Sequence, residues 1–391
     1  MRTLIELYDE RPLENILSTQ VFAPERTVFI CPPEIAGSKS VHSTLHRYFD
    51  KIHVSTQIVM LAADMYDVDN LLKVLGEVTD KYPGCVLDIT GGTDQALFAA
   101  GVLNARKATA AFTYSRKSNT FFSISNAPFG ESLACTARMS VEDFFLMAGG
   151  AVRKGRVDNS VLSSYSQFFR PFFDVYMRYK REWTTLVYWF QRVSAPVNGK
   201  IQLDVSTPWQ IKGERGYISC NPEALNSLAK MGFIKQLRIE TGKSVSFRFR
   251  DAQVRTWLRD IGSVLETYIY QACVDSKLFS DVCTSVVVDW EGTGEQSNVT
   301  NEIDVMASFG VVPVFISCKT CEIKTEALNE LSVLKDRFGG KMARAAIVTT
   351  TKTQAITRRR AFELGIEVFD SDDMKKDRLN NRLKSLIKPI Q

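Results

Sequence analysis

Two neighbouring stretches determine how the C-terminal third of this chain is interpreted: Asn301-Glu302-Ile303-Asp304-Val305 and Val314-Phe315-Ile316-Ser317-Cys318-Lys319. Residues two apart in a β-strand share a face, so the side chains of Glu302 and Asp304 are expected to point the same way. Lys319 follows Asp304 by fifteen residues, which is enough for a hairpin to bring it back beside the acids. Two acids and a lysine at neighbouring strand ends can hold a divalent metal ion and place an ammonium group beside a phosphate.

The residue types in this pattern assign roles. Hard carboxylate oxygens favour Mn²⁺ or Mg²⁺, so Asp304 is the expected central ligand, with Glu266 from the preceding helix and the backbone carbonyl of Cys318 as further ligands. Lys319 is expected to position or deprotonate the attacking water, or to stabilise charge on the phosphate. Glu302 is interpreted as a second acid near the metal or as a surface partner for a lysine. The alternative is that all are solvated strand residues, but their apolar neighbours argue against an exposed sheet.

The segments around these residues predict an αβββαβ unit. An apolar stripe formed by Val254, Leu258, Ile261, Leu265 and Tyr268 predicts one helix over residues 252–273. The remaining elements are expected to be strands 284–290, 301–308 and 311–319, helix 324–338, strand 344–350, helix 353–363, strand 366–369 and a C-terminal helix.

The first 150 residues alternate between predicted strands and helices. This alternation favours a parallel sheet with helices on both faces. The expected strands are 3–8, 26–31, 56–62, 84–89 and 108–114, and the expected helices are 12–19, 40–50, 67–80 and 93–105. A hairpin is expected to follow over residues 111–124.

One strand end in this region is distinctive, because a buried strand runs into Thr90-Gly91-Gly92-Thr93 and then opens a helix. Glycines let backbone approach a ligand closely, and hydroxyls with helix N-terminal amides suit an anionic or polar group. The alternative is that Thr90 or Thr93 simply caps the helix. Strand-end geometry adds the loop at Asp9, Glu10 and Arg11 and the loop at Ser38 and Lys39 as weaker ligand candidates.

Composition narrows the class of protein. The chain has 391 residues and 45% hydrophobic content, and its apolar runs are too short to span a bilayer. Eight scattered cysteines indicate reduced, cytoplasmic usage rather than a disulfide framework. Residues 151–250 hold 17 lysines and arginines against 7 acidic residues, an excess that indicates a nucleic-acid footprint or an ordinary basic surface. Within them, a helix at 222–231 and strands 234–240 and 244–250 resemble the end of a winged-helix module.

Together these features resemble the CARF-domain nucleases of type III CRISPR defence, in which a Rossmann-like sensor is fused to a restriction-endonuclease-like effector. The resemblance rests on Asp88-Ile89-Thr90-Gly91-Gly92-Thr93 and on the two stretches quoted first. It implies an α/β chain with three parts: a CARF-like domain over residues 1–150, a basic helical and winged-helix-like module over 151–250, and a PD-(D/E)xK-type nuclease domain over 251–391. The family pattern has an acid where this chain has Ser317. Either Glu266 and Glu302 compensate for it, or metal affinity is weak, or the nuclease is inactive, and we expect the first.

The resemblance also implies an activity. A homodimer is expected to bind a cyclic oligoadenylate, often cyclic tetraadenylate, through Thr90, Gly91, Gly92 and Thr93, and then to cut DNA or RNA non-specifically with Mn²⁺ or Mg²⁺. Two other functions stay open. One is a ligand-responsive regulator that binds nucleic acid with an inactive nuclease domain, and the other is a Rossmann-type small-molecule enzyme with an accessory domain.

Overall fold

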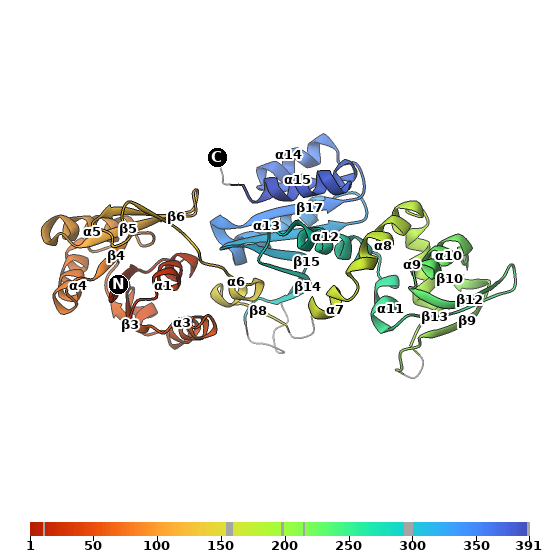
Figure 1. Ribbon diagram of the computed structural model, residues 1–391, viewed down its shortest axis with the longest axis horizontal. Coiled ribbons are helices and arrows are strands. Elements are labelled where there is room, and N and C mark those ends of the chain that lie inside the picture. The colour runs from red at the N-terminus through yellow and green to blue at the C-terminus, as the bar shows by residue number, and fades with distance from the viewer. Residues whose placement is uncertain (11, 154–158, 197–198, 214–215, 293–299, 389–391) are drawn as a thin grey trace.

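A computed structural model describes residues 1–391 except 11, 154–158, 197–198, 214–215, 293–299 and 389–391. Three units lie in a row along an elongated molecule, and the part built from the C-terminal residues is in the middle, between the N-terminal residues and residues 159–250 (Figure 1). We call residues 1–140 the N-terminal unit and residues 159–250 the central module. Residues 251–391, together with residues 141–152 that pack on their sheet or pair with it, are the C-terminal unit. The predicted fold class, a Rossmann-like unit followed by a winged-helix-like module and an αβββαβ unit, is confirmed.

The N-terminal unit is a seven-stranded sheet between two helical layers. Its strands are β1 (Thr3–Leu7), β2 (Arg26–Cys31), β3 (Gln57–Ala62), β4 (Val86–Asp88), β5 (Ala110–Ser115), β6 (Thr120–Ser125) and β7 (Ser132–Ala134). Their order is β3-β2-β1-β4-β5-β6-β7. The first five strands are parallel, β6 pairs antiparallel with β5, and β7 pairs antiparallel with β6. The predicted parallel sheet and the hairpin of β5 and β6 are therefore confirmed.

Helices cover both faces of this sheet, as the unbroken apolar strands require. They are η1 (Pro12–Asn15), α1 (Leu17–Phe22), α2 (Pro33–Ala36), α3 (Lys39–Lys51), α4 (Val68–Lys81) and α5 (Asp94–Lys107). Alternate strand residues divide between two cores. Leu4 and Phe29 pack with α1 and α3, whereas Ile5, Val28 and Leu87 pack with α4 and α5.

The C-terminal unit is built on a six-stranded mixed sheet. Its strands are β14 (Asp281–Asp289), β15 (Thr300–Phe309), β16 (Val312–Lys319), β17 (Arg344–Thr349), β18 (Ile366–Phe369) and the short β8 (Ala151–Val152). The order is β18-β17-β16-β15-β14-β8, in which β14, β15 and β16 form an antiparallel meander and β17 and β18 run parallel to β16. The helical segments are α6 (Val141–Met147), α12 (Ser263–Ser276), α13 (Thr325–Gly339), η3 (Gly340–Met342), α14 (Ala355–Glu363), η4 (Ser371–Asp373) and α15 (Lys376–Leu386).

The single helix predicted over residues 252–273 is wrong. The structure has two helices there, α11 (Ala252–Leu258) and α12, separated by residues 259–262. Asp260 accounts for the break, because its Oδ1 accepts hydrogen bonds from the backbone N–H groups of Gly262 and Ser263 and so starts a new helix. The apolar stripe continues across the break, which is why periodicity alone did not reveal it.

The central module combines helices with two small sheets. Its helices are α7 (Asn159–Ser163), α8 (Ser166–Arg178), α9 (Trp183–Val193) and α10 (Pro222–Lys230). Its strands are β9 (Asp204–Pro208), β10 (Gln210–Gly213), β11 (Gly216–Ser219), β12 (Ile234–Glu240) and β13 (Ser244–Phe249), arranged as β12-β13-β9 and β10-β11.

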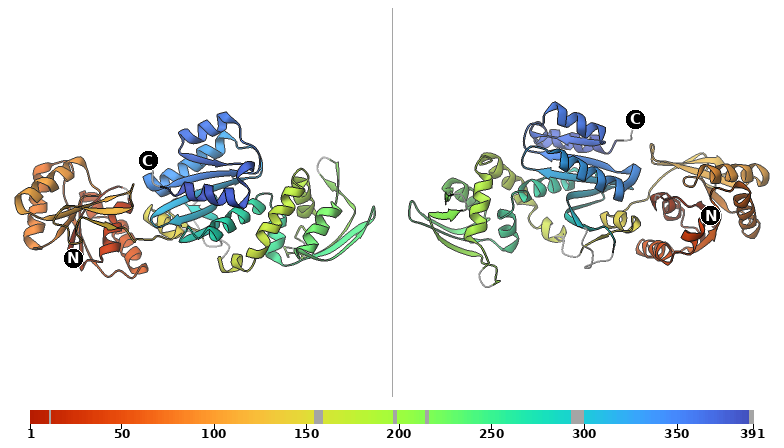
Figure 2. Two further views of the ribbon diagram at one scale, coloured as in Figure 1. Left: turned by 45° about the horizontal axis from the view of Figure 1, so that its top comes forward. Right: turned by 180° about the vertical axis from the view of Figure 1, so that it is seen from behind.

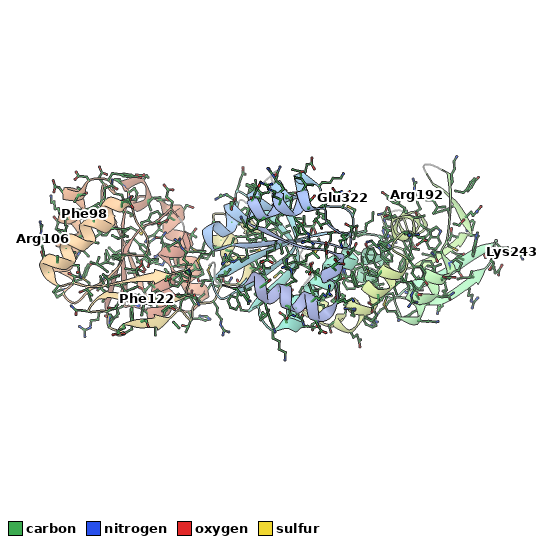
Figure 3. All side chains as sticks on the ribbon, turned by 90° about the horizontal axis from the view of Figure 1, so that it is seen from above. Phe98, Arg106, Phe122, Arg192, Lys243 and Glu322 are labelled. Carbon is green, nitrogen blue, oxygen red and sulfur yellow. The ribbon has the colours of Figure 1, made fainter. Side chains whose placement is uncertain are left out.

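The central module and the C-terminal unit share one hydrophobic core. Phe173 of α8 stacks on Tyr268 of α12 with ring centroids 4.0 Å apart, and the same cluster includes Val305 and Ile316 of the C-terminal sheet. The two further views in Figure 2 show the central module beside the C-terminal unit, on the side away from the N-terminal unit. In Figure 3, Lys243 lies at the end of the molecule farthest from the N-terminal unit. The predicted domain boundaries stay a prediction.

Two sequence expectations concern the chain as a whole. Each of the eight cysteines falls in the described part of the chain, and all are free thiols. No helix among the described residues combines the length and the apolar character needed to cross a membrane.

Candidate active site and ligand-binding loop

A local distortion of the C-terminal sheet shapes the site at Asp304. The β14–β15 pairing continues on both sides of Ser285 and Asp304 but omits this pair, and Ser285 has a φ of 52°. Thr284 Oγ1 donates to the Asp304 carbonyl at 2.8 Å and so satisfies an acceptor that the ladder leaves open. On the other side, the β15–β16 pairing ends at Val305 and Ile316. The distortion therefore leaves Asp304 at the point where β15 and β16 separate.

The Asp304 carboxylate fills this gap and meets the end of β16. Its Oδ2 accepts from the Cys318 N–H at 2.6 Å and from Ser317 Oγ at 3.1 Å. Lys319 Nζ lies 3.6 Å from the same oxygen, and the two side chains are only 16% and 35% exposed. The hairpin thus returns Lys319 beside Asp304, as the sequence spacing predicted.

Two further carboxylates surround this pair. Burial, followed by the nearby charges of Asp304, Asp260 and Glu302, raises the pKa of Glu266 to about 8, although Lys319 opposes the shift. Burial and then the Asp304 charge also raise the pKa of Glu302, although a hydrogen bond with Ser285 works in the opposite direction. We call Glu266, Glu302, Asp304 and Lys319 the acid–lysine cluster. Three acids and one lysine thus meet in a poorly solvated place, where the raised pKa of Glu266 favours a proton on this carboxyl unless a cation takes its place.

The helix break described above places Glu266 in this cluster. A Cβ at Gly262 would lie 2.5 Å from Glu266 Oε1, so the Glu266 carboxyl rests against the backbone at this glycine, and a larger residue there would push the carboxyl aside. Sequence reasoning missed Asp260, whose carboxylate holds the turn just before α12 and whose charge helps to raise the pKa values of Glu266 and Glu302. Its signal was available in the Asp-x-Gly-Ser stretch, which is typical of a helix start.

These donors fit a divalent ion that binds together with its substrate. In the described part of the chain, no three His, Cys, Asp or Glu side chains form a ready-made metal cage. Mg²⁺ commonly binds through one or two carboxylates and completes its shell with water and substrate phosphates. Asp304 and Glu266 provide such a pair, and their mutual repulsion is what a cation would relieve. Ser317 contributes a hydroxyl that donates to Asp304 rather than a further carboxylate.

In the N-terminal unit, the Thr90–Thr93 loop lies where the strand order reverses. Strand β1 has β2 on one side and β4 on the other, so the helices that follow these strands diverge and leave a crevice at the strand ends. A Cβ at Gly91 would lie 2.9 Å from the Leu7 carbonyl oxygen, and one at Gly92, whose φ is 96°, would lie 2.9 Å from Leu7 Cβ. Both glycines are therefore required by the close approach of the loop to the end of β1.

Both threonines of this loop already have partners. Thr93 caps α5, because its Oγ1 accepts from the Ala96 N–H at 3.2 Å. Thr90 Oγ1 accepts from the Tyr114 N–H at 2.9 Å and donates to Asp88 Oδ1. The capping alternative is thus realised at Thr93, whereas Thr90 ties the loop to β4 and β5.

A pair of buried acids lies beneath the loop. Glu6 and Asp88 are paired across β1 and β4 and are 2% and 1% exposed. Burial raises the pKa of Asp88 to about 6, and burial followed by the charge of Asp88 raises that of Glu6 well above its usual value. Ser18 and Thr90 donate to the Asp88 carboxylate, so this carboxyl fastens the loop from inside the fold.

The weaker ligand candidates are placed differently. Asp9 lies beside the loop, because a Cβ at Gly91 would be 2.9 Å from Asp9 Cβ, and its backbone is held by Asn15 through bonds of 2.9 and 2.7 Å. Lys39 is exposed at the start of α3, which follows β2 rather than β4. Arg11 lies outside the described residues.

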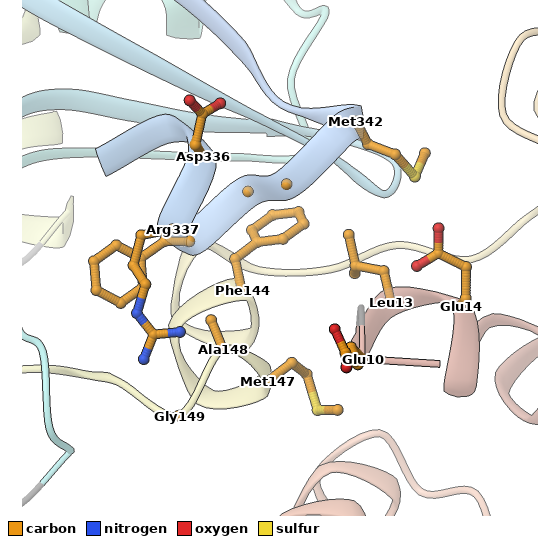
Figure 4. Close-up of a pocket in the computed structure, with 13 residues that line it drawn as sticks. Glu10, Leu13, Glu14, Phe144, Met147, Ala148, Gly149, Asp336, Arg337 and Met342 are labelled. Atoms are coloured by element: carbon orange, nitrogen blue, oxygen red, sulfur yellow. The ribbon is translucent and has the colours of Figure 1, made fainter. Parts of the chain in front are cut away.

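The loop after β1 also faces the C-terminal unit. A cavity of about 380 Å³ lies between Glu10, Leu13 and Glu14 on one side and residues of α6 and α13 on the other. Figure 4 shows Leu13 and Glu14 across from Phe144, with Met342 above them. The end of β1 therefore lies at the junction of the two units.

Comparison with known proteins places this geometry in a family. Residues 253–386 match the model of the Card1-like endonuclease domain. The protein VC1899 from Vibrio cholerae has a similar structure, with 18% identity, a TM-score of 0.75 and coverage of 98% of each chain. Can2 from Sulfobacillus thermosulfidooxidans, solved in complex with cyclic tetra-adenylate, has 17% identity, a TM-score of 0.70 and coverage of 99% of each chain.

The two structural likenesses show a shared fold over nearly the whole length. No curated protein matches the chain. The resemblance to the CARF-domain nucleases of type III CRISPR systems is confirmed, with the match to the Card1-like endonuclease domain confined to residues 253–386.

Proposed function

We propose that this protein is a metal-dependent nuclease activated by a cyclic oligoadenylate, with cyclic tetraadenylate as the expected activator. The observation that carries the proposal is the convergence of Asp304 and Lys319, 3.6 Å apart, beside Glu266 in a domain of the Card1-like endonuclease family. Support for the activator comes from the fold shared with Can2, which was solved with cyclic tetra-adenylate.

Each residue of the acid–lysine cluster has its own proposed role. Asp304 and Glu266 would hold Mn²⁺ or Mg²⁺ with the Cys318 carbonyl, and the bound ion would activate water and polarise the phosphate. The Lys319 ammonium, held near Asp304 but 35% exposed, reaches a phosphate oxygen and stabilises charge that develops there. Glu302 adds negative charge that favours the cation.

Activator binding is assigned to the crevice beside β1 and β4. Because the hydroxyls of Thr90 and Thr93 are engaged internally and Gly91 is buried, the half-buried Gly92 and the N-terminus of α5 are the groups proposed to face a phosphodiester ring. Asp9 borders this crevice. A cyclic activator with two-fold symmetry requires a two-fold protein, so we propose a homodimer. Phe98, 63% exposed on α5 and visible on the surface in Figure 3, is an apolar contact that a second copy can cover.

The test is a cleavage assay of the purified protein with Mn²⁺ and a panel of RNA, single-stranded DNA and duplex DNA. We expect cleavage only when cyclic tetraadenylate is present, and no cleavage by Asp304→Ala under the same conditions. Retained cleavage by Asp304→Ala would contradict the assignment of the nuclease centre. The panel identifies the substrate class, and other ring sizes of oligoadenylate identify the activator.

One observation favours a second function, a regulator with an inactive nuclease domain. Ser317 stands where the family pattern has an acid, and its hydroxyl is turned to Asp304. In that case every substrate stays intact, while cyclic tetraadenylate changes the affinity of the protein for a labelled duplex. Filter binding with and without the activator distinguishes the two functions.

A further inference from the structure

A second cavity at the junction of the N-terminal and C-terminal units has an unusual charge. It encloses about 630 Å³ between the turn of the β5–β6 hairpin, the segment around Thr136–Arg138, the end of α12 and the β15–β16 turn. Among the described residues that line it, five are lysine or arginine and none is aspartate or glutamate. We call this space the junction cavity.

The five cations fall into two groups. Arg116 forms an ion pair with Glu14, and Arg344 donates to the carbonyl oxygens of Met342 and Ala343, so these two are held by the protein. Lys117, Arg138 and Lys277 are exposed, and within the described ranges no carboxylate pairs with any of them. Their mutual repulsion is unrelieved, and an anion with several charges would relieve it.

The junction cavity is separate from the nuclease centre. Lys277 ends α12, whereas Glu266 lies near the start of that helix, about 16 Å away at 1.5 Å per residue. Phe309 and Val312 flank the β15–β16 turn, at the opposite end of those strands from Asp304 and Lys319. A phosphate in this cavity therefore cannot be the one that is cleaved.

The cavity is connected to both sites through the fold. On one side, Tyr114 lines it and donates its N–H to Thr90 of the activator loop. On the other side, α12 runs from Lys277 to Glu266 of the acid–lysine cluster. An anion that bridges Lys117 and Lys277 would tie the hairpin of one unit to the catalytic helix of the other.

We propose that the junction cavity is a regulatory binding site for a small polyphosphate, such as a nucleoside triphosphate. Linked phosphates supply the multiple negative charge that Lys117, Arg138 and Lys277 favour, and arginine and lysine are the usual phosphate-binding side chains. The volume lies within the range of about 300–1,000 Å³ that is common for small-molecule sites. The inference does not depend on whether the C-terminal unit cleaves nucleic acid.

The test measures binding of inorganic triphosphate and of ATP to the full chain by titration calorimetry, without divalent metal and near physiological salt. We expect both to bind, and Lys117→Glu and Lys277→Glu each to weaken binding at least about tenfold. The matched control is Lys73→Glu, which reverses an exposed lysine on α4, away from the cavity. Comparison of ATP with inorganic triphosphate shows whether the nucleoside contributes.

A second measurement tests the bridge between the units. Hydrogen exchange of the amides in residues 115–120 and 277–280 should slow when triphosphate binds, and should not slow in Lys277→Glu. Absence of triphosphate binding, or equal binding by the parent and the charge-reversed variants, would overturn the proposal. Loss of cyclic tetraadenylate binding in the same variants would also overturn it, because the cavity would then be part of the activator site.

Discussion

The Thr90–Thr93 loop, proposed to bind the activator, and the acid–lysine cluster, proposed to cleave, both lie at strand ends, but their carboxylates have opposite surroundings. Asp88 is buried, and hydroxyl and N–H donors from Ser18 and Thr90 occupy both of its oxygens. Glu266 and Glu302 lie close to Asp304 with Lys319 as the nearby cation. The first site is therefore fixed by bonds within the chain, whereas the second brings together carboxyls whose mutual repulsion a cation from outside would relieve.

Removal of one charge from the nuclease centre is expected to have the largest effect. Asp304→Asn keeps an oxygen for the Cys318 N–H but loses the central ligand, so cleavage should fall by at least about 10³-fold with little change in the melting temperature. Cleavage rates at saturating Mn²⁺ measure this. Asp377→Asn, an exposed acid of α15, is the control, and an equal loss in both variants would show that the effect is not local.

A larger side chain in the Thr90–Thr93 loop should disrupt this loop by a steric clash with the end of β1. Gly91→Ala places a Cβ 2.9 Å from the Leu7 carbonyl oxygen, which should destabilise the N-terminal unit by about 1–3 kcal/mol and weaken activator binding. Gly101→Ala is the matched control, because nothing lies within 4 Å of its added Cβ, and a helical alanine should stabilise by about 0.5–1 kcal/mol. Denaturant unfolding decides, and equal stability of the two variants would contradict the account.

An acid at position 317, as in the family pattern, should strengthen metal binding at the acid–lysine cluster. Ser317→Asp adds a carboxylate beside Asp304 and Lys319, so the Mn²⁺ concentration for half-maximal cleavage should fall about tenfold. Without metal the same variant should melt at a lower temperature, because a further like charge is unrelieved. Ser317→Ala separates loss of the hydroxyl from gain of the charge. A higher Mn²⁺ requirement in Ser317→Asp would mean that position 317 does not face the ion.

The smallest effect is a change in how stability depends on pH. The folded-state pKa values of Glu6 and Asp88 are raised, so their contribution to stability is complete below the usual values of 4.5 and 3.8 and is lost as the pH rises, through about 6 for Asp88. Glu6→Gln removes one of these groups and should be more stable than the parent by about 1 kcal/mol near pH 8, with the difference vanishing near pH 4.5. Melting curves across this range measure it, and a difference that grows toward acid pH would contradict the sign.

Sequence patterns predicted most of the fold because period and spacing are local properties. The Asp304–Lys319 spacing predicted a hairpin that returns the lysine, and the alternation in residues 1–150 predicted the parallel sheet. The helix break at Asp260 was missed because the apolar periodicity continues across it and gives no sign that one helix ends and another begins. The distortion at Ser285 depends on how two strands pair, and the absence of Asp and Glu among the described residues of the junction cavity depends on how two units pack. Neither feature can be predicted from a local sequence pattern.

The central claim is that Asp304 and Glu266 hold a cation beside Lys319. Its most direct test is a Mn²⁺ titration followed by electron paramagnetic resonance, in which the signal of free Mn²⁺ is lost as the ion binds. The account predicts that the parent protein, with a non-cleavable oligonucleotide present, removes this signal, and that Asp304→Asn and Glu266→Gln leave it largely intact. Equal Mn²⁺ binding by all three proteins would contradict the account.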